Sequence, residues 1–520
     1  MKNKIVTAAE AAAKIPDGAM IAICGVGPHG VAMEVYEAVA ARFESEGQPK
    51  DISLIHSGGN MGSKTFAKDG MLAAYYSGLP NLDSDLMASD VFPVYSLTQG
   101  IAVQLYRAQA NDSPFLSKAG INTFLDPRIE AGAINPKAKA KPIVEVVTLG
   151  GEEYLHYQLP KINCALIRAT SADLEGNLTN EDEQVKFELL YLAMAAHNNG
   201  GIVIAQVKNI AKNGSLNGGD IKVPGMLVDY VVPCTDQAKY HMPVSNAPFS
   251  AAQDGFHKVD ESLIPLETYA PDGERLAVVR RAAAELWPGC ICNIGIGMPV
   301  GVSYVVSKEG IHDMFVLSNE LGAVGGHLGG AFFFPTAFNA RAYLNHHEMF
   351  DFINGHGLDI TFLGAAEVGE DGSVNVTRIG GRIHGSGGFV NIAASTKKIV
   401  FISSMTIGGK HAIENGLLKI TEPGRGGKFQ KKVDQISFNG KDVPKRGQEI
   451  YYVTERAVFK LIDGKVTLIE YADGLDVEKD ILAFMEFKPE ISPDLKPMPK
   501  YCFETGLIGL KEQWQKQLGK

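Results

Sequence analysis

The sequence predicts two tandem, structurally similar open α/β domains whose sheets are mainly parallel. The first observation behind this prediction is the length of 520 residues, which exceeds the ~100–200 residues of a single domain. The second is that apolar runs of about four to six residues alternate with segments of helical spacing, a pattern typical of buried parallel strands separated by helices. The third is an internal repeat, in which the order of motifs in the first half of the chain recurs in the second half.

The repeat opens with a helix, a short apolar run and a glycine-rich loop. In the first half these are residues 7–14, 19–24 and 25–30, and in the second half they are residues 275–286, 290–294 and 295–301. Thr7 and Glu10 have the spacing of a capping box, which predicts that the first helix begins directly after Thr7. Gly18 and Gly289 precede the two apolar runs at equivalent places, so the two segments align.

Three further strands repeat in the same order, and only the loop lengths between them differ. The matching segments are 52–58 with 314–320, 164–179 with 360–375, and 202–205 with 399–402. We therefore predict duplicated domains over residues 1–245 and 272–520, joined by a linker over residues 246–271. Parallel sheets bind ligands at the carboxyl ends of their strands, and glycines of this chain gather directly after the apolar runs.

The composition excludes several classes of function. Lys and Arg number 49, and Asp and Glu number 59, so the formal net charge is −10; nucleic acids and anionic membranes require a basic footprint. No segment reaches the ~18 apolar residues of a membrane span. The six cysteines are scattered, which indicates free thiols in a reducing cytoplasm. We expect a cytoplasmic protein with neither a nucleic acid nor a membrane as its partner.

A single acid stands at the end of a predicted strand. Glu320 follows an apolar run of the second half and precedes a glycine-rich stretch that includes Gly322, Gly325 and Gly326. The equivalent position in the first half is Gly58, so the acid is present in only one copy of the repeat. An acid in one copy indicates a chemical task, and the alternative interpretation is a helix cap.

Two other clusters contain candidate functional groups. A second group of glycines ends in Gly387 and Gly388, whose backbone N–H groups would suit an oxyanion hole; the alternative is a loop that requires left-handed residues. His346, His347 and Glu348 are residue types that bind metals. Because adjacent side chains point apart, we expect surface residues at these three positions and no metal site in the chain.

Four motifs, taken in order, resemble those of family I coenzyme A transferases over essentially the whole chain. They are YSLTQG at 95–100, NIGIGMP at 293–299, SNELGAVGG at 318–326 and GSGGFVNI at 385–392. The stretch 363–392 is most similar to the propionate/acetate branch, which acts on short-chain acyl groups. The acid stands one place later than in the S-E-N-G motif of the family, and the glycines that follow align it as Glu320.

The resemblance implies a role for each matching residue. Glu320 corresponds to the catalytic nucleophile and Gly388 to the backbone donor of the oxyanion hole. Gln99 and Asn293 correspond to polar groups of the acyl site. The other positions expected to bind substrate or CoA are Gly295, Gly297, Gly322, Gly325, Gly326 and Gly387. The implied reaction is a ping-pong transfer of CoA from a short-chain acyl-CoA to a free carboxylate, such as acetate, propionate, butyrate or acetoacetate, through a glutamyl-CoA thioester.

The resemblance also bears on cofactors, partners and alternatives. It implies no permanently bound cofactor, acyl-CoA and short-chain carboxylic acids as substrates, and a homodimer or homotetramer. An acyl-CoA hydrolase of the same fold is the alternative enzyme, and a CoA-binding module is the non-enzymatic alternative. Phe332, Phe333 and Phe334 follow the Glu320 loop, where they would either narrow the acyl pocket or belong to the hydrophobic core.

Overall fold

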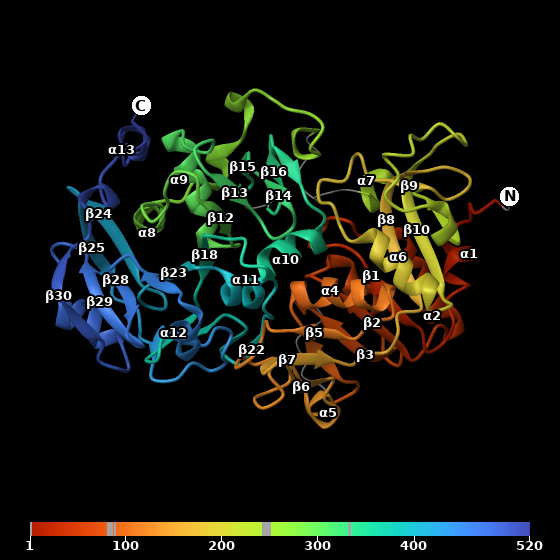
Figure 1. The fold of residues 1–520 in the computed structure, drawn as a ribbon, viewed down its shortest axis with the longest axis horizontal. Helices are drawn as coiled ribbons and strands as arrows, with labels where there is room; N and C mark the ends of the chain where they lie inside the picture. The colour runs from red at the N-terminus through yellow and green to blue at the C-terminus, as the bar shows by residue number, and fades with distance from the viewer. Residues whose placement is uncertain (1–2, 81–86, 88–89, 242–250, 331–333, 520) are drawn as a thin grey trace. The chain divides into compact units, whose positions relative to one another are not determined.

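The computed structural model describes residues 3–80, 87, 90–241, 251–330 and 334–519, and Figure 1 shows its trace. Contacts divide the chain into two compact units. The first comprises Met1–His257, Leu344–Phe350 and Gly381–Asn391, and the second comprises Lys258–Tyr343, Asp351–Gly380 and Ile392–Lys520. The first unit therefore includes two short segments from the second half of the sequence, which the internal repeat does not predict.

The first unit is built on a sheet of parallel strands. In sheet order these are β11 (Tyr230–Pro233), β10 (Ile202–Ile210), β8 (Cys164–Ala172), β1 (Met20–Ile23), β2 (Ile52–His56), β3 (Leu72–Ser77) and β4 (Val94–Ser96). Neighbours on this path pair in parallel, and β9 (Leu178–Thr179) joins β8 in antiparallel. A separate antiparallel sheet consists of β5 (Phe115–Ser117), β7 (Glu152–Tyr157) and β6 (Val144–Leu149).

Helices accompany these strands because parallel strands require crossover connections. They are α1 (Ala8–Ala12), α2 (Met33–Glu46), α4 (Gln99–Ala110), α5 (Pro136–Ala140), α6 (Leu189–Asn198) and α7 (Gln237–Tyr240). In Figure 1, α1 lies against α2 and α4 lies against α6. The predicted capping box is present: the Thr7 hydroxyl accepts a hydrogen bond from the N–H of Glu10 at 3.2 Å, and the Glu10 carboxylate accepts one from the N–H of Thr7 at 2.8 Å.

The second unit contains a mixed sheet with a parallel centre. In sheet order its strands are β17 (Ala342–Tyr343), β14 (Ala323–Val324), β13 (Val316–Ser318), β12 (Ile291–Ile294), β18 (Ile360–Gly364), β23 (Lys398–Ile402), β27 (Glu449–Val453), β28 (Ala457–Ile462), β29 (Lys465–Tyr471) and β30 (Glu490–Pro497). The five strands from β13 to β27 pair in parallel. The helices are α8 (Gly273–Ala283), α9 (Gly301–Glu309), α12 (Val443–Arg446) and α13 (Leu510–Gln517), while α10 (His346–Asn354) and α11 (Phe389–Ser395) each contain residues of both units.

Five strands of one sheet match five strands of the other. The first sheet runs β11-β10-β8-β1-β2, and the second runs β27-β23-β18-β12-β13. The four predicted repeats correspond to β1 with β12, β2 with β13, β8 with β18, and β10 with β23. The predicted fold class, two similar α/β domains with mainly parallel sheets, is therefore confirmed. Beyond the shared strands the sheets diverge: β3 and β4 are parallel additions, whereas β14, β17, β28 and β29 are antiparallel.

The strand registers correct one detail of the repeat. In the first sheet Met20 pairs with Ser53, and in the second sheet Ile291 pairs with Val316. Since Met20 and Ile291 are equivalent in the repeat, Ser53 is equivalent to Val316. The sequence alignment of these strands is therefore wrong by one residue. A strand buried on both faces is a continuous apolar run, and such a run does not define its own register.

The corrected register changes the counterpart of the candidate nucleophile. Counting along both strands from the paired positions leads to Ser57 in the first unit and Glu320 in the second, so Gly58 is not the equivalent of Glu320. The inference that only one copy of the repeat has an acid at this position still holds.

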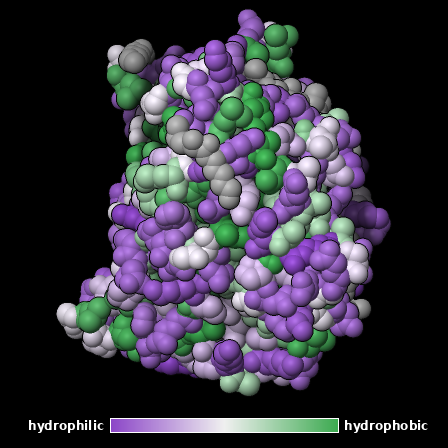
Figure 2. Space-filling view, turned by 90° about the vertical axis from the view of Figure 1, so that its right-hand side faces the viewer, coloured by the Kyte–Doolittle hydropathy of each residue, from purple (hydrophilic) through white to green (hydrophobic). Residues whose placement is uncertain are grey.

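The surface in Figure 2 carries hydrophobic residues interspersed among hydrophilic ones. Apolar residues among polar ones are normal on the surface of a folded protein. Within the part of the chain that the structure describes, no helix is both long and apolar enough to cross a membrane.

His56, at the end of β2, links the stability of the first unit to pH. It is fully buried and lies 2.6 Å from the hydroxyl of Tyr75. Burial lowers the pKa of His56 to about 3, whereas a histidine in an unfolded chain has a pKa of about 6.5. The stability that neutral His56 contributes is therefore fully present above about pH 6.5 and is lost as the pH falls toward 3, by up to ~1.4 kcal/mol per pH unit.

We expect His56→Gln to flatten the decline of the urea unfolding midpoint between about pH 6.5 and 4.5, because one proton fewer is taken up on unfolding. His384→Gln, which changes an exposed histidine, is the control. Its unfolding midpoint should fall with pH as steeply as that of the parent chain. If the unfolding midpoint fell with the same pH slope in His56→Gln as in the parent chain, His56 would not be a buried neutral group.

Candidate active site

Glu320 lies just beyond the carboxyl end of β13, in the parallel centre of the second sheet. The strand ends at Ser318, and only 9% of Glu320 is exposed. The chain then turns sharply: the N–H of Gly322 donates to the carbonyl of Asn319 at 3.2 Å, and β14 returns antiparallel to β13. The carboxylate is therefore carried on a tight turn at the edge where parallel sheets generally bind ligands.

Asn319, which the sequence motifs do not single out, organises this turn. Its side-chain oxygen accepts hydrogen bonds from the N–H groups of Leu321 at 3.0 Å and Ala323 at 3.3 Å. Its side-chain amide donates to the carbonyl of Pro335. An asparagine that bonds to the backbone two residues later stabilises a turn. Asn319 therefore holds the backbone around Glu320, and the signal in the sequence is an asparagine directly before the acid.

Two glycines of the turn are required by the fold itself. Gly325 has φ +71° and Gly326 has φ +76°, values that side chains rarely adopt. A Cβ atom on Gly325 would lie 2.4 Å from Nε of Arg341, and one on Gly326 would lie 2.3 Å from the carbonyl oxygen of Phe338. These contacts explain on structural grounds why both positions hold glycine. That the two glycines bind substrate stays a prediction.

Asn293 lies beside the strand that carries Glu320, because it pairs with Ser318 across β12 and β13. Its side chain is fully buried. The side-chain oxygen accepts a hydrogen bond from the Thr361 hydroxyl at 3.2 Å, and the amide nitrogen has no hydrogen-bond partner among the described residues. The structure thus places a buried amide donor near the carboxyl end of the central strand.

Gly295 and Gly297 connect β12 to α9. The N–H of Gly295 donates to the carbonyl of Phe362 at 2.9 Å, which fixes the start of the loop. Gly297 has φ +88°, and a Cβ atom there would meet nothing within 4 Å. The loop is therefore fixed at Gly295 and open at Gly297.

The phenylalanine run after this loop is described only in part. Phe334 is half-buried and packs against the hydrophobic core of the second unit. Phe332 and Phe333 lie outside the described residues.

In the first unit, Gln99 lies next to the second glycine cluster. It is the first residue of α4, whose N-terminus is capped by the Thr98 hydroxyl. The backbone N–H of Gln99 donates to the carbonyl of Gly387 at 2.9 Å. The Gln99 side chain is buried, and its oxygen has no hydrogen-bond partner among the described residues.

The glycine pair itself provides one amide donor and not two. The N–H of Gly387 donates to the carbonyl of Gly78 at 2.9 Å, so the expectation that this N–H faces a ligand is wrong. The N–H of Gly388 has no hydrogen-bond partner within the described ranges. Only Gly388 therefore remains a candidate oxyanion donor.

Ser57, the counterpart of Glu320 in the first unit, belongs to a buried polar network with Glu188 and His346. The Ser57 hydroxyl donates to one carboxylate oxygen of Glu188 at 3.1 Å, and the other oxygen lies 2.9 Å from Nδ1 of His346. All three side chains are buried. Burial raises the pKa of Glu188, but the charge and the hydrogen bond of His346, together with a backbone hydrogen bond and the charge of His347, outweigh burial, and the pKa is lowered. The sequence contains no motif that marks Glu188.

The prediction that His346 and His347 are surface residues is wrong, because both are buried. Their side chains do point to different neighbours. His346 pairs with Glu188, whereas the ring of His347 stands edge-on to the ring of Tyr191 at a centroid distance of 4.5 Å. The segment 344–350 packs into the first unit, and this packing buries both rings.

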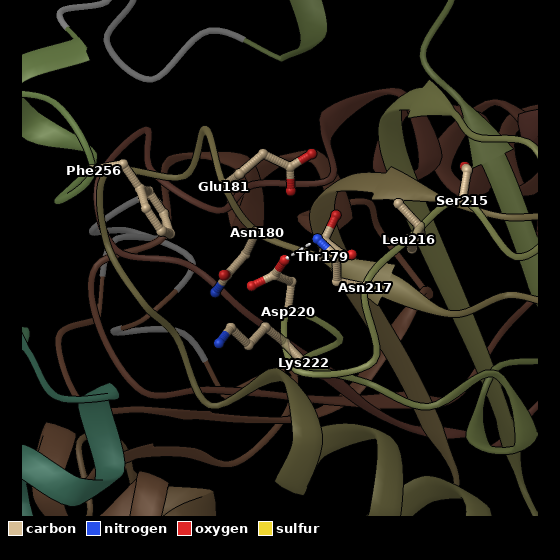
Figure 3. A pocket seen from close by; sticks show the side chains of 9 residues that line it. All are labelled: Thr179, Asn180, Glu181, Ser215, Leu216, Asn217, Asp220, Lys222 and Phe256. Carbon is tan, nitrogen blue, oxygen red and sulfur yellow. Dashed lines mark hydrogen bonds between the residues drawn. The ribbon is translucent and has the colours of Figure 1, made fainter.

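The first unit contains a pocket of about 240 Å³, and Figure 3 shows the side chains that line it. Asn217 and Asp220 face each other in it and share a hydrogen bond of 3.0 Å. Its lining residues are Thr179, Asn180, Glu181, Ser215, Leu216, Asn217, Asp220, Lys222 and Phe256. This lining contains no residue that the motifs assign to catalysis or binding.

Comparison with known proteins establishes the family. The family model described as coenzyme A transferase matches residues 5–233. A caffeate CoA-transferase of Acetobacterium woodii is 39% identical over 98% of both chains, and the acetate CoA-transferase YdiF of Escherichia coli K12 is 36% identical over 97% of this chain and 96% of its own. The crystal structure of the acyl-CoA transferase YdiF apoenzyme from Escherichia coli O157:H7 matches with a TM-score of 0.90 at 36% identity, over 98% of this chain and 97% of that chain.

The chain belongs to the coenzyme A transferase family. It is an enzyme that transfers coenzyme A between an acyl-CoA and a carboxylate. In this CoA-transferase the predicted site residues fall into two sets, one in each unit. The first unit holds Gln99, Gly387 and Gly388, and the second holds Asn293, Gly295, Gly297, Glu320, Gly322, Gly325 and Gly326.

Gly326 of this CoA-transferase allows a test of the turn that carries Glu320. We expect Gly326→Ala to lower the Tm by more than Gly464→Ala does. Both glycines have φ +76°, so both variants bear a strain of ~1–2 kcal/mol. Only Gly326 would also bring its Cβ against the Phe338 carbonyl, which adds ~1–3 kcal/mol.

Gly464→Ala is the matched control because a Cβ atom there meets nothing within 4 Å. Thermal unfolding followed by circular dichroism measures both variants. Equal losses in Tm would show that the Phe338 carbonyl does not restrict the Glu320 turn.

Proposed function

We propose that this CoA-transferase moves CoA from a short-chain acyl-CoA to a free carboxylate, with Glu320 as the covalent carrier. The observation that carries the proposal is the position of Glu320. It is a buried carboxylate at the carboxyl end of a parallel strand, on a turn held by Asn319. A thioester complex with CoA has been solved for the YdiF enzyme of Escherichia coli O157:H7, which matches this chain with a TM-score of 0.89 at 35% identity. A thioester route for this chain is in keeping with that structure.

The proposed reaction has two half-reactions that mirror each other. A carboxylate oxygen of Glu320 attacks the thioester carbonyl carbon, the C–S bond breaks, and CoA leaves as the thiolate. The thiolate then attacks the Glu320 carbonyl carbon of the resulting mixed anhydride, which releases the donor acid as its carboxylate and leaves a glutamyl-CoA thioester. The acceptor carboxylate enters and reverses these steps. Each step exchanges one acid or thioester for a similar one, so covalent catalysis divides one difficult transfer into easier steps.

Each attack forms a tetrahedral oxyanion, and we assign the backbone N–H of Gly388 as its donor. The support is the amide without a partner among the described residues, together with the glycine motif. Loss of one oxyanion donor costs ~2.7–4 kcal/mol in enzymes where it has been measured. We assign the buried amides of Gln99 and Asn293 to the acyl site, where each retains one polar side-chain atom without a hydrogen-bond partner among the described residues.

Incubation with an acyl-CoA alone tests the covalent step. We expect the intact mass of the chain to increase by the mass of CoA less one water, because the glutamyl-CoA thioester forms before any acceptor enters and one glutamate oxygen leaves with the donor acid. Glu320→Ala should abolish the increase, and Glu320→Asp should slow transfer by ~10²-fold, because the carboxylate retracts by about one methylene. Glu370→Ala removes an exposed acid and should leave the increase unchanged. A CoA adduct that persists in Glu320→Ala would place the nucleophile elsewhere.

Dependence on the acceptor acid tests transfer against hydrolysis. We expect the rate of acyl-CoA consumption to rise with acceptor concentration. The glutamyl thioester reacts with the acceptor carboxylate, and water is excluded from the site. The panel is acetate, propionate, butyrate, acetoacetate and caffeate, since the relatives are named for acetate and for caffeate. A turnover rate that no acid alters would identify an acyl-CoA hydrolase, and a preference for caffeate would contradict the short-chain assignment.

The remaining assignments concern assembly and surroundings. We propose a homodimer or homotetramer in the cytoplasm, with CoA as a substrate and no permanently bound cofactor for the transfer. The cytoplasmic assignment is supported by the six cysteines, all of which are free thiols. Reducing compartments keep thiols in this state.

A further inference from the structure

The second unit brings together two histidines and a glutamate that the transfer reaction does not use. His312 lies in the turn after α9, His327 lies in β15 (His327–Leu328), and Glu261 lies in the short 3₁₀ helix Glu261–Leu263. One ligand atom of each residue lies within 4.8 Å of the others. We propose that Glu261, His312 and His327 bind a zinc ion that has a structural role. This inference goes beyond the proposed function and departs from the expectation, drawn from the sequence, that the chain has no metal site.

The distances between the ligand atoms suit one metal. Nε2 of His312 lies 3.2 Å from Oε1 of Glu261, and Nε2 of His327 lies 3.7 Å from the same oxygen. Zinc bonds of ~2.0–2.2 Å in a tetrahedral arrangement place neighbouring ligand atoms about 3.3–3.5 Å apart. The two observed distances lie on either side of this range, so small side-chain movements suffice.

His327 provides an independent sign of a ligand. It is only 4% exposed, and its Nε2 makes no hydrogen bond among the described residues, since the Glu261 oxygen at 3.7 Å is within ion-pair range but beyond hydrogen-bond distance. A buried ring nitrogen without a partner is costly, and a metal ion would satisfy it. On the other side of the ring, Nδ1 lies 2.9 Å from the hydroxyl of Ser307. When Nδ1–H donates to that hydroxyl, Nε2 keeps its lone pair and is ready to bind a metal.

The segment that carries Glu261 is anchored on both sides. Before it, the N–H of Val259 donates to the side chain of Asn339 at 3.0 Å, and that side chain donates back to the carbonyl of Val259 at 2.8 Å. After it, Glu267 forms an ion pair with Lys308 of α9 at 2.9 Å. The carboxylate of Glu261 is therefore presented to the histidines by a fixed backbone.

The donor set favours zinc over the alkaline-earth ions. Two imidazoles and one carboxylate suit zinc, whereas magnesium and calcium prefer oxygen ligands alone. The Glu261 side chain is 63% exposed, so solvent can supply a fourth ligand. In Figure 1, α9 and β15 lie side by side. A zinc ion would join both to the segment around Glu261.

Titration of the metal-free full-length chain with Zn²⁺ against a chromophoric chelator tests the site. We expect one Zn²⁺ per chain and a higher Tm with the ion bound. Excess Mg²⁺ should not compete. Glu261→Gln and His312→Gln should each weaken binding by at least about tenfold, and Ser307→Ala should weaken it about tenfold by releasing the His327 ring.

Asp313→Asn is the matched control, because it removes an exposed acid directly after His312 that is not one of the three ligands. It should bind Zn²⁺ like the parent chain. Co²⁺ should show the visible absorption of a tetrahedral site in the parent chain and lose it in Glu261→Gln. Absence of binding by the parent chain, or equal affinity in Glu261→Gln and the parent, would overturn the proposal. Neither result depends on CoA transfer.

Discussion

Parallel pairing of β12 with both β13 and β18 is the constraint on which the candidate site depends. It brings the carboxyl ends of the strands to one edge of the sheet, so that Asn293 lies in β12 and Glu320 lies on the turn after the neighbouring strand β13. Parallel neighbours can be connected only through crossovers, and the crossover from β12 to β13 begins at the glycine loop 295–301 and continues into α9. A strand end, a glycine loop and a helix start therefore meet where ligands bind in α/β proteins.

The two units have different side chains, held by different contacts, at equivalent strand ends. At the equivalent strand end, the first unit has Ser57, whose hydroxyl bonds to a buried Glu188 that is paired with His346. A buried charge needs such a partner. The second unit has Glu320 on a turn that Asn319 shapes through backbone hydrogen bonds. The duplication thus preserved the sheet, and the side chains at the strand ends were free to diverge.

Both clusters of charged residues described here are assembled from separate segments. Glu188 and His346 are 158 residues apart in the chain, and Glu261 and His312 are 51 apart. Helical or strand periodicity cannot reveal such groups, since it relates only neighbours within one element. The proposed zinc site therefore has no counterpart among sequence motifs, although each of its residue types is a common zinc ligand.

The sequence by itself determined the α/β class, the duplication, the Thr7 capping box and the strand end that carries Glu320. Apolar runs, turn residues and capping residues act within a few positions of each other, so they can be recognised in a single sequence. The tertiary structure decided the strand register, the burial of His346 and the internal hydrogen bond of Gly387. Each of these depends on which distant segment lies opposite, and that is settled only when the strands pair and the segments 344–350 and 381–391 pack into the first unit.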